Sequence, residues 1–152
     1  MIVEADKLKI YEVISNLLVN AVKFTRKKSL DDVTIREIDR SNIGDNMNDG
    51  IIIISSKMKS SPSYNKDDNS DVTRKGRRRR SEVIVSIKDR GTGIDPDIQD
   101  KLFSKFVTKS DTGSGLGLYI SKSIIEAHGG KIWAENNRDG KGATFTFSLP
   151  IS

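Results

Sequence analysis

The sequence predicts an α+β fold, a two-layer α/β sandwich in which helices cover one face of a mixed, mostly antiparallel sheet. Three observations lead to this prediction. Apolar residues recur at helical spacing in two long segments, four short runs have the composition of strands, and the order along the chain is helix, strand, strand, helix, helix, strand, strand. The 152 residues are the length of one domain, so we expect 1–152 to form a single domain.

The helices are predicted from apolar spacing and capping residues. A first helix from Ala5 to Phe24 would bury one stripe: Leu8, Tyr11, Ile14, Leu17, Leu18 and Ala21. Asp95, followed by Pro96, is typical of a helix start that leads into "DIQDKLFSKF". A third helix should run from Leu116 until "HGG" at 128–130, where glycine can adopt a positive φ.

Four strands are expected at "GIIIISS" (50–56), "EVIVSIKD" (82–89), "KIWAE" (131–135) and "ATFTFSLP" (143–150), the last two joined by the turn "NNRDGKG". The polar residues 26–50 are interpreted as a loop with a short strand at "DDVTIREI". The segment 57–82 is basic and rich in Ser and Asp, so we expect a disordered insertion there.

The positive charge of the chain is concentrated in that insertion. The net charge is +5, and residues 57–80 alone carry nine Lys or Arg against three Asp, which is +6 and leaves about −1 for the rest. The run "RKGRRRR" could bind a nucleic acid or an acidic partner, but it lacks interleaved aromatic residues, which favours a solvated loop. Nucleic acid is therefore not an expected partner.

Cysteine and histidine usage excludes several kinds of site. The chain has no cysteine and one histidine, so disulfides, thiolate metal sites and a histidine-based zinc site are not expected. The longest apolar run, "GIIII", is too short to cross a bilayer, and the first residues do not resemble a signal peptide. These features favour an intracellular, reducing location.

Polar residues on the first helix form one candidate site. Asn16, Asn20 and Lys23 are spaced i, i+4 and i+7, so they share a face that differs from the apolar one. Asparagine is a poor helix former, so two of them in mid-helix need either solvent or a function. A solvated face and a binding face both remain open from these three residues alone.

A second candidate follows the strand at 82–89. In "DRGTGID", Asp89 lies at the strand end, and its carboxylate could accept a hydrogen bond from the exocyclic amino group of adenine, whereas guanine would present an oxygen. Gly91 and Gly93 would let the backbone pass close to a flat base. A simple Asx-type turn is the alternative interpretation of this stretch.

The glycine-rich "GSGLGL" opens the third helix. Gly113, Gly115 and Gly117 would leave unpaired backbone N–H groups at a helix N-terminus, where an anion is favoured. The stretch is not a dinucleotide fingerprint, because "FVTKSDT" before it is not a strand, and no P-loop pattern occurs in the chain. Lys105 and Lys109 could reach phosphates, although solvated lysines are the alternative.

Five motifs in a fixed order resemble those of one known family. "NLLVNAVKFT", "DRGTGID", "LFSKF", "GSGLGL" and "GKGATFTFSLP" are similar to the N, G1, F, G2 and G3 boxes of the ATP-binding catalytic domain of sensor histidine kinases. That family belongs with gyrase, MutL and the ninety-kilodalton heat-shock chaperones. The resemblance covers residues 1–27 and 82–150 and implies a Bergerat-type ATP-binding fold that uses ATP and Mg²⁺.

The resemblance also implies roles for individual residues. Asn20 matches the magnesium ligand, Lys23 would meet a phosphate, Asp89 would bind adenine, and Lys109 would approach the terminal phosphate from a mobile lid. Phe103 and Phe106 resemble anchors of that lid. The remaining residues expected around the nucleotide are Gly91, Gly93, Ile94, Phe106, Gly113, Gly115, Leu116, Gly117, Leu118 and Thr144.

Asn16 favours phosphoryl transfer over hydrolysis. In hydrolysing relatives a Glu at this position acts as the general base for water, and an amide cannot do this, so the resemblance implies a protein-histidine kinase in which Asn16, Asn20 and Lys109 are catalytic. The alternative is a nucleotide-dependent switch module without phosphotransfer. The resemblance further implies that the accepting histidine lies on a separate dimerisation domain, with a response regulator downstream. His128, at a helix end, is expected to be structural.

The resemblance also leads to expectations about the partner domain, the oligomeric state and the cellular location. The dimerisation domain would belong to a longer chain or to a partner protein, and the isolated chain is expected to be a monomer in the cytoplasm. A full-length parent protein could be anchored in a membrane.

Overall fold

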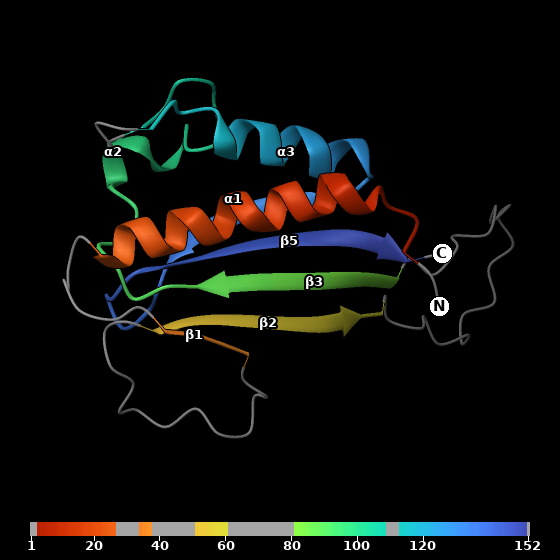
Figure 1. Ribbon diagram of the computed structural model, residues 1–152, viewed down its shortest axis with the longest axis horizontal. Helices are drawn as coiled ribbons and strands as arrows, with labels where there is room; N and C mark the ends of the chain where they lie inside the picture. The colour runs from red at the N-terminus through yellow and green to blue at the C-terminus, as the bar shows by residue number, and fades with distance from the viewer. Residues whose placement is uncertain (1–2, 27–33, 38–50, 61–80, 109–112, 152) are drawn as a thin grey trace, which may run out of the picture.

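The computed structural model describes residues 3–26, 34–37, 51–60, 81–108 and 113–151. Three helices lie on one side of a five-stranded sheet (Figure 1). The predicted α+β sandwich, with helices on one face of the sheet, is therefore confirmed.

The sheet has the strand order β1-β2-β3-β5-β4. β1 (Thr34–Glu37) is parallel to β2 (Ile51–Lys59), and the pairs formed by β2, β3 (Ser81–Lys88), β5 (Ala143–Ile151) and β4 (Lys131–Asn136) are antiparallel. The sheet is thus mixed and mostly antiparallel, as predicted, and the neighbouring strands β3 and β5 carry the ladder on which the candidate site is built.

The two long helices, α1 (Lys7–Arg26) and α3 (Gly117–Ala127), run antiparallel to one another (Figure 1). The side chain of Asp6 starts α1 by accepting hydrogen bonds from the backbone N–H groups of Leu8 at 2.9 Å and Lys9 at 3.2 Å. Gly129, with φ of 74°, follows the end of α3, so the predicted glycine stop is confirmed.

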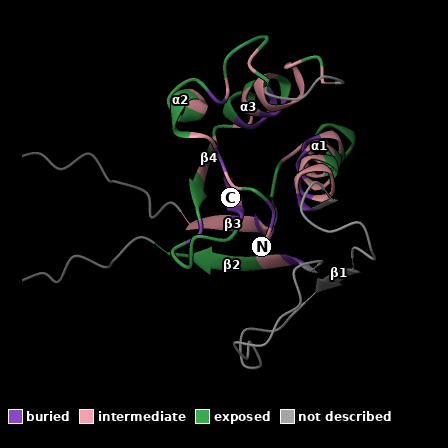
Figure 2. Cartoon of the chain, turned by 90° about the vertical axis from the view of Figure 1, so that its left-hand side faces the viewer, coloured by how far each residue is buried: buried purple, intermediate pink, exposed green. Residues whose placement is uncertain are grey.

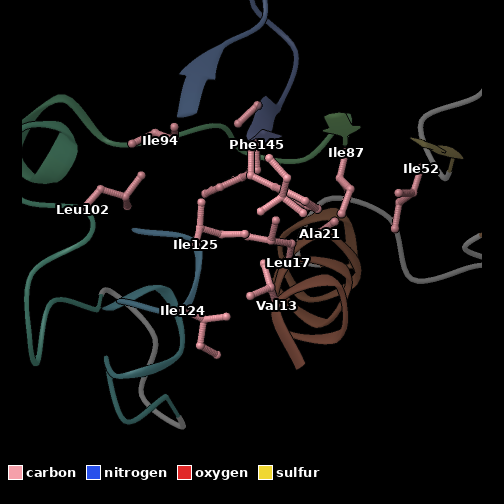
Figure 3. Close-up of a cluster of buried hydrophobic side chains, with 13 residues drawn as sticks. Val13, Leu17, Ala21, Ile52, Ile87, Ile94, Leu102, Ile124, Ile125 and Phe145 are labelled. Carbon is pink, nitrogen blue, oxygen red and sulfur yellow. The ribbon is translucent and has the colours of Figure 1, made fainter. Parts of the chain in front are cut away.

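The core lies between the helices and the sheet (Figures 2 and 3). Val13, Leu17 and Ala21 of α1 are at most 1% exposed, and they share one cluster with Ile87 of β3 and Phe145 of β5. Alternation along β3 and β5 puts these inward residues on the face that the helices cover. The helix layer therefore packs on the neighbouring strands β3 and β5.

The predicted apolar stripe of α1 is partly wrong. Leu8 is 79% exposed and Tyr11 is 73% exposed, whereas Val13, which the prediction omitted, is fully buried. At 3.6 residues per turn, Leu8 and Tyr11 point about 140° and 160° away from Val13. The true stripe is therefore centred on Val13, Leu17 and Ala21, and Ile14 and Leu18 are only partly buried beside it.

Two other predicted boundaries also change. α2 (Pro96–Gln99) is capped by Asp95, whose carboxylate accepts from the Asp97 N–H at 2.9 Å, but the helix does not continue through "DKLFSKF". The predicted insertion 57–82 begins too early, because residues 57–59 still pair with residues 82–84. The expected disorder of residues 61–80 lies outside the described residues. No helix in the described part of the chain has the length and apolar character of a membrane span.

Candidate functional site

Asp89 is a carboxylate buried at the end of β3. It is 2% exposed, and its Oδ1 accepts hydrogen bonds from the backbone N–H groups of Gly91 at 2.9 Å and Ala143 at 3.2 Å. Its own N–H continues the ladder by donating to the Ala143 carbonyl at 2.9 Å. By strand alternation, its side chain lies on the same face as Ile87, which is the face covered by the helices. The predicted strand-end position of Asp89 is thus present.

Burial dominates the electrostatics of this carboxylate. Desolvation raises the pKa of Asp89 above its ordinary value, and the two hydrogen bonds from Gly91 and Ala143 oppose this by favouring the ionised form. Both bonds end on Oδ1, so Oδ2 has lone pairs left for a further donor. A buried acceptor of this kind suits a ligand that presents an N–H group.

Gly91 allows the loop after β3 to touch the end of α1. A Cβ on Gly91 would lie 2.7 Å from both the carbonyl carbon and the carbonyl oxygen of Phe24, and 3.0 Å from the backbone nitrogen of Thr25. Only a residue without a side chain fits at this approach. The close neighbour of Gly91 is thus the C-terminal turn of α1, and its expected approach to a flat base stays a prediction.

Two asparagines that the sequence prediction missed hold the loops around Asp89. Asn137 is 9% exposed, and its Nδ2 donates to the Asp89 carbonyl at 2.8 Å and to the Lys141 carbonyl at 2.6 Å. Asn136 binds both backbone groups of Ile94, accepting from its N–H at 2.7 Å and donating to its carbonyl at 2.9 Å. Their only sequence signal was the turn "NNRDGKG", which gave no reason to place them beside Asp89.

Thr144 is not brought to the carboxylate of Asp89. Its hydroxyl donates to Oδ1 of Asn137 at 2.7 Å. By alternation along β5, Thr144 shares a face with Thr146, whose hydroxyl is 3.1 Å from that of Ser86, and this face is opposite to the one that holds Ala143. The strand turns this hydroxyl to the other side of the sheet from Asp89, and the expected role of Thr144 near the nucleotide stays a prediction.

The polar face of α1 lies against the start of α3. Nδ2 of Asn16 is 3.4 Å from the carbonyl oxygen of Gly117 and 3.4 Å from Oγ of Ser121. Since the helices are antiparallel, α1 continues past the N-terminus of α3 (Figure 1). Asn20 and Lys23 follow Asn16 on the same face, so they are carried beyond the first turn of α3.

The N-terminus of α3 is suited to an anion. Gly117 is its first residue and Leu118 its second, and Leu116 precedes them without a side-chain cap hydrogen bond. The first N–H groups of a helix lack partners within it, and the helix dipole favours negative charge there. Asn20 and Lys23 share the helix face of Asn16, so the helical spacing directs an amide and an ammonium toward this end of α3.

The segment before α3 departs from the prediction at Phe106. Phe106 is 73% exposed with φ of 62°, and its N–H donates to the Gly115 carbonyl at 3.0 Å, so its ring does not anchor the segment in the core. Phe103, by contrast, packs against the core as expected. Lys105 places its ammonium 4.9 Å from the centre of the Tyr119 ring.

Three other expected site residues complete the comparison with the sequence. Gly113 lies just before "SGLGL" at the edge of the described residues, and Gly93 adopts a φ of 75° beside Asn136. Lys109 lies outside the described residues, so its expected approach to a phosphate stays a prediction.

The metal expectation is consistent with the donors that are present. Among the described residues, no group of three or more His, Cys, Asp or Glu could hold an ion. Mg²⁺ in nucleotide sites is bound by one or two protein oxygens together with phosphates and water, so a single amide oxygen from Asn20 fits such an ion.

Comparison with known proteins identifies a family. Residues 5–152 match the model of the histidine kinase-, DNA gyrase B- and HSP90-like ATPase family. The sensor protein FixL of Bradyrhizobium diazoefficiens is 56% identical over 70 residues, which is 46% of this chain and 14% of FixL. The sensor protein kinase WalK of Staphylococcus aureus is 32% identical over 153 residues, which is 97% of this chain and 27% of WalK.

A solved structure supports the same relationship. The nucleotide-free catalytic domain of histidine kinase ThkA superposes with a TM-score of 0.56 at 30% identity, covering 97% of this chain and 71% of that one. Full-length ShkA in complex with AMPPNP superposes with a TM-score of 0.59 at 24% identity, a likeness of fold. The chain spans 14% and 27% of the length of FixL and WalK, so it corresponds to one part of such proteins.

Proposed function

Because the chain belongs to the histidine kinase-, DNA gyrase B- and HSP90-like ATPase family, we propose that it is the ATP-binding catalytic domain of a two-component sensor histidine kinase. In this proposal it transfers the γ-phosphoryl group of Mg-ATP to a histidine on a separate dimerisation domain. A response regulator would accept the phosphoryl group afterwards.

One observation carries the proposal, namely the contact of Asn16 with the first turn of α3. This contact fixes the antiparallel arrangement in which the polar face of α1 extends past the N-terminus of α3. Phosphates at that N-terminus would be within the region reached by Asn20 and Lys23. The base would then lie toward Asp89, which is joined to the C-terminal turn of α1 through Gly91.

Each end of this arrangement selects one part of the nucleotide. The buried carboxylate of Asp89 accepts a hydrogen bond from the amino group of adenine, and it repels the oxygen that guanine presents in place of that group. Lys23 and the α3 N-terminus bind the phosphates electrostatically. Asn20 would hold Mg²⁺ through its amide oxygen, and the ion would neutralise charge on the phosphates.

The surroundings of Asn16 favour transfer over hydrolysis. Its amide is engaged with Gly117 and Ser121, and an amide has no basic site to take a proton from water. In transfer to histidine, an imidazole nitrogen bonds to the γ-phosphorus as the bond to the bridging oxygen breaks, and ADP leaves. This reaction depends on positioning and charge neutralisation, which the described residues can supply.

A second candidate function is a nucleotide-dependent switch module that binds ATP and a partner without transfer. It is compatible with the single histidine of this sequence, His128, because both of its ring nitrogens make hydrogen bonds within the fold. We also propose a cytoplasmic location, where ATP is available and where a chain without cysteine needs no oxidising compartment.

Labelled phosphate distinguishes these functions. The chain is incubated with γ-labelled Mg-ATP and a panel of purified histidine-bearing dimerisation domains. Acid-labile label on at least one acceptor supports the kinase, and ATP binding without label on any acceptor supports the switch module. An Asn20→Asp variant should lose transfer, because its carboxylate repels the phosphates, whereas Gln99→Glu on the exposed α2 makes the same change of group and should transfer normally.

A further inference from the structure

Thr25 is a polar residue at a core position. The buried stripe Val13, Leu17 and Ala21 repeats every four residues, and Thr25 continues it at 1% exposure. Its Oγ1 is buried and has no hydrogen-bond partner among the described residues. Buried hydroxyls are normally paired, so an unpaired one calls for a physical reason.

Thr25 does not make the hydrogen bond that a hydroxyl in a helix usually makes to the backbone. A Ser or Thr in a helix can donate to the carbonyl four residues earlier, and Ser123 of α3 does so with Tyr119 at 3.0 Å. Thr25 makes no such bond to Ala21. A valine has nearly the same shape and would fill this core position without an unpaired polar atom, so packing alone does not explain the hydroxyl.

Thr25 and Asp89 both lie next to Gly91. The backbone nitrogen of Thr25 lies 3.0 Å from where a Cβ of Gly91 would be, and the Gly91 N–H donates to Oδ1 of Asp89 at 2.9 Å. Both side chains belong to the layer between helices and sheet, Thr25 by the stripe of α1 and Asp89 by the alternation of β3. Both polar side chains are therefore buried in the same layer at this end of the core.

The hydroxyl supplies what this end of the site otherwise lacks. Ala143, the neighbour of Asp89 on β5, offers only its backbone N–H, which is already bonded to Asp89. Asp89 is an acceptor only, whereas a hydroxyl can donate as well as accept. The Watson–Crick edge of adenine presents an amino donor beside a ring-nitrogen acceptor, so an acceptor and a donor together match it.

We propose that Thr25 is a further base-binding residue, whose hydroxyl hydrogen-bonds to adenine directly or through one water beside Asp89. This inference rests on the proposed function, because it assumes that Asp89 binds the base. In this inference the Thr25 hydroxyl has no partner in the nucleotide-free protein and gains one when the base binds.

The test uses Thr25→Val, which removes only the hydroxyl. We would measure the unfolding temperature of the full chain without nucleotide. We would also measure its affinity for ATP and for inorganic tripolyphosphate. The variant should unfold at the same temperature as the wild type or higher, yet bind ATP about five- to tenfold more weakly, the value of one hydrogen bond. Tripolyphosphate binding should be unchanged, and Thr25→Ser, which keeps the hydroxyl, should bind ATP within about twofold of the wild type.

Thr146→Val is the matched control. Thr146 is 5% exposed, but its hydroxyl is paired with that of Ser86 on the opposite face of the sheet. This variant should lower the unfolding temperature, because Ser86 loses its partner, and should leave ATP affinity unchanged. The two substitutions thus move stability and affinity in different directions.

Three outcomes would overturn the inference. Thr25→Val with normal ATP affinity removes Thr25 from the site while leaving the proposed function intact. Thr25→Val that is less stable or does not fold shows that the hydroxyl serves the nucleotide-free protein. A wild-type chain that does not bind ATP would overturn the proposed function and this inference together.

Discussion

The backbone N–H of Asp6 donates a 3.0 Å hydrogen bond to Nε2 of His128, which joins the start of α1 to the end of α3. Since Nε2 accepts, the ring proton lies on Nδ1, which is 2.7 Å from the Ile124 carbonyl and donates to it. Both nitrogens are therefore occupied within the fold. These contacts support the structural role that the sequence suggested for the one histidine of the chain.

Replacing His128 with alanine should destabilise the chain without affecting nucleotide binding. Two hydrogen bonds are lost, so we expect a decrease of about 1–2 kcal/mol in the free energy of unfolding. ATP affinity should stay unchanged, because α3 has 11 residues and separates His128 from its N-terminus by roughly 16 Å. Urea unfolding and calorimetric titration measure the two effects, and a large loss of ATP affinity would contradict this account.

The chain should not phosphorylate itself. Neither nitrogen of His128 is available, and the residue lies at the end of α3 opposite to the one assigned to phosphates. Incubation with γ-labelled Mg-ATP should therefore leave no acid-labile label on the protein. Label that disappears in His128→Gln would show that the histidine is an acceptor after all.

Asp89→Asn should lose ATP binding while the fold survives. The asparagine Oδ1 can still accept from Gly91 and Ala143, but its amide presents a donor to the amino group of adenine. We expect an unfolding temperature at or above that of the wild type at pH 7 and ATP affinity reduced by at least about tenfold. Near-normal ATP affinity in a folded variant would remove Asp89 from the site.

The raised pKa of Asp89 gives this prediction a pH dependence. A carboxyl whose pKa is higher in the folded state than in the unfolded state opposes folding when ionised. Stability contributed by Asp89 should therefore rise as the pH falls through its folded pKa, and level off below its ordinary value of 3.8. The wild type should gain stability relative to Asp89→Asn over that interval, and an unchanged difference would contradict the raised pKa.

Gly142 and Gly140 form a matched pair for testing the packing around Asp89. Their φ values are 76° and 73°, but a Cβ on Gly142 would collide with the Asp89 carbonyl, whereas one on Gly140 would meet nothing within 4 Å. Gly140→Ala should cost about 1 kcal/mol for the left-handed backbone alone. Gly142→Ala should cost roughly 3 kcal/mol or more and weaken ATP binding by displacing Asp89. If urea unfolding showed the same loss of free energy for both variants, the collision of a Gly142 Cβ with the Asp89 carbonyl would be excluded.

The basic insertion should be dispensable for folding and ATP binding. Lys59 and Glu82 are paired in the β2–β3 ladder, so replacing residues 60–81 with Asn-Gly closes a two-residue hairpin. The shorter loop has less closure entropy to lose, by about 2 kcal/mol, so the unfolding temperature should stay the same or rise. A deletion product that is unfolded or does not bind ATP would assign the insertion a structural role.

The sequence alone determined the order of the elements, the fold class and the positions of the motifs. These features depend on local information, such as the apolar spacing of α1, the Asp95 cap and the strand-end position of Asp89, which neighbouring residues specify directly. The family resemblance then followed from motif order.

The tertiary structure decided which side chains meet, because those contacts join residues far apart in the chain. Asn137 and Asp89 are 48 positions apart, and Asp89 and Ala143 are 54, so no periodicity relates them. Strand alternation turned Thr144 away from Asp89. The packing of α1 on β3 and β5 buried Thr25 and left Leu8 and Tyr11 exposed. Local spacing predicts that a face exists, whereas its orientation depends on the partner against which it packs.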